Sequence, residues 1–239
     1  MHALPRRPLA AAFLCTALTL SATACGRFVG DLTRPEILGE AIRATEPADF
    51  VTVHSDGFSL AVPVKSRSSR DNRGNCTWTL SHGASDTVDV IRVDGAVYVR
   101  RDEARLRREE SHRTPEDLEA LIGRLKDRWT KSPADGPDAP EGLGTCSRKV
   151  GFPRLENGWD DDSMEPTAST VDGRKALKLA KPAGGDGETT TLYVAAEGPP
   201  HFLKIVMTGG ETPGTTTYDY DRPVEVKAPP AEDVVVVVD

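Results

Sequence analysis

The sequence has few aromatic residues, no excess of positive charge and no apolar run long enough to span a bilayer as a mature helix. Phe, Trp and Tyr make up 5% of the 239 residues, and the formal net charge is −7. An acidic chain without a clustered basic face is a poor partner for nucleic acid, so none is predicted. The length allows one domain, or two small ones, with a core that is stable without a metal.

Catalytic motifs are also missing. The chain contains no Gly-x-Ser-x-Gly, no His-Glu-x-x-His and no dinucleotide-binding fingerprint, and its histidines have no paired spacing. We therefore predict no catalytic residue, no metal site, no cofactor and no enzyme activity. A His-Asp-Ser group brought together only in the folded chain stays open at this stage.

The N-terminal residues have the layout of a bacterial signal peptide. Arg6 and Arg7 precede a short apolar run that ends at Leu20, and the small residues at 22–24 stand directly before Cys25. Small residues before a cysteine resemble a lipobox, which predicts a signal peptide over 1–24, a lipidated N-terminus and tether over 25–34, and palmitate-type acylation of Cys25. An ordinary secretory signal that leaves Cys25 as a spare thiol is the alternative.

After the predicted cleavage, the acyl chains are what would hold the protein on the membrane. Removing two arginines and no acids changes the formal charge from −7 to −9 (−7 − 2), so an anionic lipid surface does not attract the chain. One acyl chain holds a protein weakly, whereas two or three hold it durably, at about 0.8 kcal/mol for each buried methylene. We expect a location on the outer side of the cell membrane.

The remaining cysteines form an even pair. Cys15 leaves with the signal peptide and Cys25 carries lipid, so Cys76 and Cys146 are predicted to form a disulfide in an oxidising compartment. The bridge would close a loop of roughly 70 residues and stabilise the fold by about 4 kcal/mol. Zinc is the competing use, but neither cysteine belongs to a Cys-x-x-Cys pair.

Apolar spacing divides the mature chain into helices and strands. A helix is predicted from Thr33 or Arg34 until Pro47, with period-two strands from Phe50 onwards and a turn at Ser55-Asp56-Gly57. A second helix begins at Thr114, and its apolar stripe is expected to cover a face of the sheet. The second half of the chain has hairpin-length spacing, which predicts an antiparallel meander within one domain over 35–239.

Four segments resemble the actinobacterial LppX/LprG-type lipoproteins, which are relatives of the LolA and LolB carriers. The segments are 93–99 (VDGAVYV), 171–173 (VDG) with Leu177 and Leu179, 192–199 (LYVAAEGP), and 218–224 (YDYDRPV) followed by Ala228-Pro229-Pro230. The resemblance implies an α+β fold: a strongly curved antiparallel β half-barrel with helices packed on its concave face. It also implies an apolar cavity that holds acylated lipids between sheet and helices.

The alternating apolar side chains are the candidates for lining such a cavity. They are Leu60, Val62, Trp78, Leu80, Val88, Val90, Leu118, Leu121, Ile122, Leu125, Leu177, Leu179, Leu192, Val194, Leu203, Ile205 and Met207. The same residues packed as a dry core are the alternative.

Two functions remain for this domain. The first is a membrane-anchored protein that binds or carries a lipid or glycolipid without covalent chemistry, with the charged segment 101–110 acting as a lid. The second is a scaffold with a filled core that binds another protein of the cell envelope.

Overall fold

The computed structural model describes residues 32–134, 159, 165–181, 183 and 187–235. The predicted signal peptide, Cys25 and Cys146 lie outside these residues. No helix in the described part of the chain is long and apolar enough to cross a membrane.

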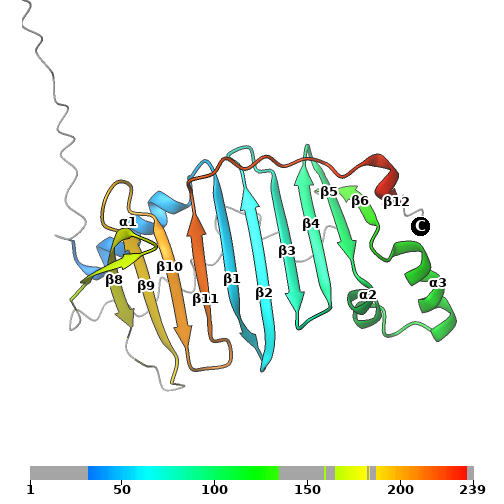
Figure 1. Cartoon of the computed structure of the whole chain (residues 1–239), viewed down its shortest axis with the longest axis horizontal. Coiled ribbons are helices and arrows are strands. Elements are labelled where there is room, and N and C mark those ends of the chain that lie inside the picture. The colour runs from blue at the N-terminus through cyan, green and yellow to red at the C-terminus, as the bar shows by residue number, and fades with distance from the viewer. Residues whose placement is uncertain (1–31, 135–158, 160–164, 182, 184–186, 236–239) are drawn as a thin grey trace, which may run out of the picture.

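The described chain forms one open sheet of twelve strands in the order β12-β6-β5-β4-β3-β2-β1-β11-β10-β9-β8-β7 (Figure 1). All neighbouring strands pair antiparallel except β12 and β6, which are parallel. The strands are β1 (Val51–Ser59), β2 (Val62–Arg70), β3 (Cys76–His82), β4 (Thr87–Val93), β5 (Ala96–Arg101), β6 (Trp129–Pro133), β7 (Thr167–Val171), β8 (Arg174–Lys181), β9 (Thr189–Ala195), β10 (Phe202–Thr208), β11 (Gly214–Asp219) and β12 (Val234–Val235).

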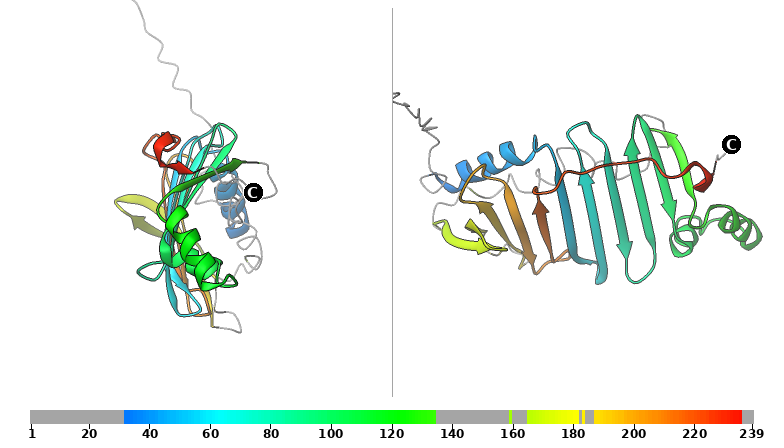
Figure 2. Two further views of the ribbon diagram at one scale, coloured as in Figure 1. Left: turned by 90° about the vertical axis from the view of Figure 1, so that its right-hand side faces the viewer. Right: turned by 45° about the horizontal axis from the view of Figure 1, so that its top comes forward.

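In this part of the chain three α-helices accompany the sheet: α1 (Arg34–Thr45), α2 (Glu103–Glu109) and α3 (Pro115–Leu125). This single large, open and mostly antiparallel sheet is consistent with the predicted curved α+β half-barrel. Figure 2 shows that α1 lies against one face of the sheet, whereas α2 and α3 lie beyond the ends of β5 and β6.

Helix α1 begins where the sequence predicted. The carboxylate of Glu36 accepts a hydrogen bond from the backbone N–H of Thr33, at 2.9 Å, and Pro35 occupies the first turn, where its missing N–H leaves no bond unmade. Ile37, Leu38 and Ala41 are buried against strands β8, β9 and β10. This contact fixes α1 at one end of the sheet.

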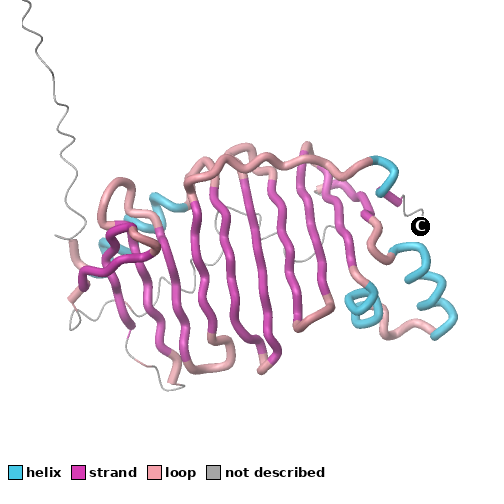
Figure 3. Tube along the Cα trace, viewed as in Figure 1, coloured by secondary structure: helices cyan, strands magenta, loops and turns pink. Residues whose placement is uncertain are grey.

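Helix α3 is where predicted, but its expected position on the sheet is wrong. Thr114 caps it, accepting a hydrogen bond from the N–H of Asp117, and its neighbour is α2 (Figure 3). The two helices connect β5 to β6, which are adjacent antiparallel strands, so a short return path holds them at the strand ends. Only Ile122 of α3 is buried.

The predicted turn at Ser55-Asp56-Gly57 is also wrong, because β1 runs straight through it and turns only after Ser59. Asp-Gly is a strong hairpin signal, but Gly57 has another use here. A Cβ on Gly57 would lie 2.6 Å from the carbonyl oxygen of Pro213, so the backbones of the two segments approach too closely for any side chain. The glycine serves strand pairing rather than the turn.

The C-terminal segment passes across the ends of the strands, from β11 to the short 3-10 helix Ala231–Asp233 and β12 (Figures 1 and 3). Val226 and Val234 pack with Val93, Tyr98 and Trp129. The guanidinium of Arg128 donates to the carbonyl oxygen of Glu232 at 2.6 Å. These contacts fasten the chain end to the strand farthest from α1.

We predict that Ile37→Ala lowers the free energy of unfolding by about 2–5 kcal/mol, because Ile37 is completely buried between α1 and the sheet. Denaturant unfolding of the mature chain measures this. The control is Glu40→Ala on the exposed side of α1, expected to change stability by less than about 0.5 kcal/mol. Equal losses in the two variants would contradict this packing.

Candidate functional site

The face of the sheet that carries α1, called here the α1 face, is the candidate site. Directly opposed residues on neighbouring strands point to the same side, so the pairings define which residues share this face. One row crosses eight strands, β8 to β10, β11, and β1 to β4, and consists of Leu179, Leu192, Ile205, Thr216, Ser55, Ser66, Leu80 and Val88.

The end of the α1 face near the helix is a closed apolar cluster. Leu179, Leu192 and Phe202 are at most 1% exposed, and Trp159 packs among them. The guanidinium carbon of Arg34 lies 5.2 Å from the centre of the Trp159 ring, a cation–π contact. Leu177 and Met207 pack at the margin of this cluster and are only partly buried.

The other end of the α1 face carries a second apolar cluster on β3, β4 and β5. Val88, Val90, Val97 and Val99 are buried together with Ala134, and Trp78 and Leu80 are partly buried at the margin that faces the middle of the sheet. The two clusters belong to one face but do not meet.

Small hydroxyl side chains occupy the middle of the α1 face. The Ser55 and Thr216 hydroxyls are 2.9 Å apart and share a hydrogen bond, and Ser66 and Ser68 stand on the next strand. Short side chains fill less volume above a sheet than leucine does. The face is therefore apolar at its two ends and hydroxyl-lined between them.

The opposite face of the sheet is polar in its middle, between an apolar cluster of Val93, Tyr98 and Trp129 and another that contains Ala176 and Ala195. Its middle row contains Lys204, Thr217, His54, Arg67 and Thr79 on consecutive strands. A hollow of about 330 Å³ opens there over β11, β1, β2 and β3, and its lining includes Thr217, His54, Arg67 and Thr79. The residues that line it carry hydroxyl, imidazole and charged groups.

Two tyrosines pack where the C-terminal end of α1 meets the start of β10. Tyr220 donates to the carbonyl oxygen of Phe202 at 2.9 Å, and the N–H of Phe202 donates to the Thr45 hydroxyl at 3.1 Å. Burial raises the pKa of Tyr218 to about 12 and also raises the pKa of Tyr220. Both phenols therefore stay neutral at physiological pH.

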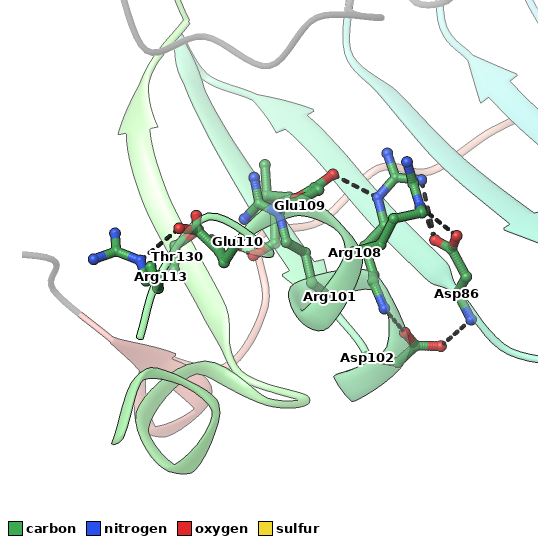
Figure 4. Close-up of polar contacts among 10 residues, drawn as sticks. Asp86, Arg101, Asp102, Arg108, Glu109, Glu110, Arg113 and Thr130 are labelled. Atoms are coloured by element: carbon green, nitrogen blue, oxygen red, sulfur yellow. Dashed lines mark hydrogen bonds and ion pairs between the residues drawn. The ribbon is translucent and has the colours of Figure 1, made fainter. Parts of the chain in front are cut away.

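Segment 101–110, the predicted lid, is a short helix held at the sheet edge by charged side chains (Figure 4). Asp102 caps α2: one carboxylate oxygen accepts the N–H of Arg105 at 2.8 Å, and the other accepts the N–H groups of Asp86 and Thr87 at 3.0 and 2.8 Å. The Asp86 carboxylate in turn accepts hydrogen bonds from Arg105 and Arg108.

The contacts with Arg105 and Arg108 shift the pKa of Asp86. Burial alone would raise the pKa, but the hydrogen bonds from Arg108 and Arg105 and their positive charges outweigh burial and lower the pKa below its usual value of 3.8. Asp86 is therefore ionised at neutral pH, and its charge fastens α2 to the β3–β4 turn. A lid made of α2 must break these contacts to move.

The structure brings most of the predicted lining residues onto the α1 face. They are Trp78, Leu80, Val88, Val90, Leu177, Leu179, Leu192, Val194, Ile205 and Met207. Leu203 packs instead with Ala176 and Ala195 in a separate cluster. The four α3 residues, Leu118, Leu121, Ile122 and Leu125, lie beyond the sheet edge, and Leu60 and Val62 are exposed at the β1–β2 turn.

Of the two cysteines predicted to form a disulfide, Cys76 lies in the described residues. Cys76 opens β3 and is completely buried on the α1 face, opposite Arg70 and Arg92. The Cys76–Cys146 disulfide and the acylation of Cys25 stay predictions.

The described residues contain no cluster of three or more His, Cys, Asp or Glu side chains arranged to hold a metal ion. His201 stacks on Tyr220 with 4.4 Å between ring centres, and burial lowers its pKa. This histidine has a packing role that its sequence position did not indicate.

The sequence interpretation missed the exposed β1–β2 turn. Phe58, Leu60 and Val62 alternate as the residues of one strand do, but Leu60 and Ala61 have positive φ angles of 48° and 66° and form a turn. No turn-forming residue marks this position. The sequence therefore carries no local signal for this turn.

No protein-family model matches the sequence, and no curated protein matches it. Solved structures do share its fold. LprF from Mycobacterium bovis aligns with a TM-score of 0.50 at 12% identity, over 82% of this chain and 96% of LprF. At this identity the likeness concerns the fold alone, and it confirms the predicted resemblance to the LppX/LprG-type fold.

Two further structures align less closely. The Mycobacterium tuberculosis lipoprotein LppX has a TM-score of 0.46 at 16% identity, over 81% of this chain and 99% of LppX. A chain of the Pseudomonas aeruginosa MucA/MucB complex has a TM-score of 0.35 at 14% identity, over 84% of this chain and 59% of that chain.

We predict that Asp86→Asn lowers stability at pH 7 by about 1–3 kcal/mol and flattens its dependence on acid. A carboxyl with a lower pKa in the folded state stabilises the fold above its unfolded pKa, and this contribution is lost as the pH falls through the folded pKa. Denaturant unfolding between pH 7 and pH 2 measures both effects. Residue 86 has a positive φ of 79°, which Asn adopts as Asp does, so the substitution adds no backbone strain. An unchanged pH profile would contradict the assignment.

Proposed function

We propose that the protein is a lipid-anchored extracytoplasmic protein whose α1 face binds the acyl chains of a lipid. The supporting observation is the pair of apolar clusters on the α1 face and the gap between them. The partly buried Leu177, Met207, Trp78 and Leu80 stand at the inner margins of these clusters, whereas the middle of the other face carries Lys, Arg, His and Thr. Apolar margins beside small central side chains suit a flexible hydrocarbon ligand.

The proposed anchor is the diacylglycerol of Cys25, supported by the small residues before it and by the acidic charge of the chain. A protein that bilayer charge does not attract needs hydrocarbon to stay on the membrane. Acylation also places the domain beside its proposed ligand.

The proposed mechanism is non-covalent. Acyl chains lie against the apolar ends of the α1 face, and the hydroxyls of Ser55, Ser66 and Thr216 face the ester or headgroup oxygens between them. An amphipathic lipid suits this pattern better than a pure hydrocarbon, because unpaired hydroxyls against hydrocarbon cost free energy. Release requires α2 to leave the Asp86 contacts.

A scaffold for an envelope protein is the second candidate. Val97, Leu192 and Val194 are completely buried, as expected if the apolar clusters serve only as a filled core. The polar hollow around His54 and Arg67 would then be the working surface. The test of the first function also separates the two.

Native mass spectrometry of the mature chain, secreted with Cys25→Ser, tests the proposal. We expect adducts of lipid mass that organic extraction removes, and Met207→Gln should reduce them several-fold, because an amide at the margin of the α1 face opposes hydrocarbon. The control is Val206→Thr, the adjacent residue on the opposite face, whose adducts should match the parent. A clean mass after incubation with host lipids would favour the scaffold.

We also predict that Asp86→Asn speeds the transfer of bound lipid to acceptor vesicles several-fold while leaving the bound amount unchanged. The substitution removes the charge that holds Arg105 and Arg108 of α2. Transfer of a fluorescent phospholipid measures the rate. Asp56→Asn, which breaks the exposed pair with Lys65, is the control. Equal transfer rates in the two variants would rule out the lid.

A further inference from the structure

The β1–β2 turn, residues 58–63, exposes three large apolar side chains and is called here the apolar turn. Phe58, Leu60 and Val62 are 49%, 76% and 44% exposed. They are the large hydrophobic residues that the described part of the chain leaves exposed, and they are consecutive in alternation on one hairpin. Single exposed apolar residues are ordinary, but three gathered at one loop tip indicate a contact surface.

The apolar turn extends beyond the paired ends of the two neighbouring strands, β11 and β3. Strand β11 begins at Gly214, opposite Gly57, and β3 ends at His82, opposite Val64, so no strand flanks the tip. Its base is held on both sides: the N–H of Phe58 donates to Pro213 at 2.9 Å, and the N–H of Gly83 donates to Pro63 at 2.7 Å. Figure 1 shows this turn at the same strand ends as its two neighbours, the β10–β11 loop and the β3–β4 turn. A firm base presents the tip to the outside.

The residues at the tip are not those that the turn geometry favours. Leu60 and Ala61 both have positive φ, the conformation of a two-residue hairpin turn in which Asn-Gly is the preferred pair. Leucine and alanine are strained there, because their Cβ atoms crowd the backbone. Since the turn would form more readily with polar residues, the leucine needs an explanation other than folding.

The apolar turn and the start of α1 lie on the same side of the sheet, where β8 and β1 have their C-terminal ends. Strands β8 and β1 run in the same direction, because four antiparallel pairings separate them, so their C-terminal ends share one edge. Arg34, the first residue of α1, donates to the carbonyl oxygen of Ala180 near the end of β8. β1 is four strand spacings away, which is about 19 Å.

The chain between Cys25 and Arg34 can bring this edge to a membrane. Nine residues reach at most about 30 Å, so a lipid on Cys25 keeps the start of α1 within that distance of the bilayer surface. The charges nearest the tip, Asp56 and Lys65, form an ion pair at 3.3 Å and cancel. A contact made by the tip with lipid is therefore apolar rather than electrostatic.

We propose that the apolar turn inserts into the interfacial region of the bilayer and sets the orientation of the domain on the membrane. The orienting role rests on the anchor of the proposed function, but insertion of the turn needs neither acylated Cys25 nor a filled α1 face. Shallow burial of apolar side chains at the headgroup boundary is the physical basis of the contact.

The test compares the mature Cys25→Ser chain with the same chain carrying Leu60→Asn and Ala61→Gly. Co-sedimentation with phosphatidylcholine vesicles should show about tenfold weaker partition for the variant, because it loses its most exposed apolar side chain. The variant should also melt about 2–4 °C higher, because Asn-Gly relieves the strained turn. Loss of binding with a gain of stability cannot come from misfolding.

Ala84→Asn is the matched control, since it places the same residue on the adjacent exposed β3–β4 turn of the same edge. Its partition should equal that of the parent. Leu60→Trp, which favours the interface, should bind at least as well as the parent and shift its emission to the blue on vesicles. Equal partition of parent and Asn-Gly variant, or no binding by either, would overturn insertion.

The result is independent of the lipid-binding test. Lipid adducts without vesicle binding would leave the proposed function in place and remove the insertion of the turn. Vesicle binding without adducts would support the apolar turn and favour a scaffold oriented on the membrane.

Discussion

Successive side chains of a strand point to opposite faces, so the register between strands decides which residues of this chain share a surface. The pairing across β8, β9, β10, β11 and β1 to β4 places Leu179, Ile205 and Leu80 on one side and Lys204, His54 and Arg67 on the other. A slip of one residue in any pair would exchange the two sets beyond that pair. The α1 contact, the hydroxyl-lined centre and the polar hollow all depend on this register.

An open sheet also has two edges whose backbone groups need partners or protection. At one edge β12, described over Val234–Val235, is fastened through Arg128, and at the other β7 is a short strand of Thr, Ala, Ser and Val. Short or polar edge strands discourage pairing with other chains. Helix α1, packed near β8, and the C-terminal segment, packed near β6, therefore stabilise opposite ends of the same sheet.

The sequence was informative where local chemistry and tertiary structure agreed. The start of α1 at Thr33 or Arg34 and the antiparallel pairing of the second half follow from residue types alone, and the structure has both. It was misleading where a tertiary contact used the signal differently. Gly57 looks like a turn residue but allows a close backbone approach, and the stripe of α3 looks like a sheet-facing surface but faces α2 and solvent.

The same distinction explains why the candidate site was only partly predictable. Alternation identified the apolar residues of β3, β4, β8 and β9 correctly, because half-buried strands leave that pattern in any sequence. Alternation does not distinguish a buried strand residue from an exposed one. The sequence therefore predicts Leu60 and Leu80 in the same lining, although 76% of Leu60 is exposed. Burial depends on which strands flank a residue, and that is settled by long-range pairing. An apolar residue that the fold leaves exposed at a strained turn therefore says more about contacts outside the domain than a buried one does, because folding alone gives no reason to keep it.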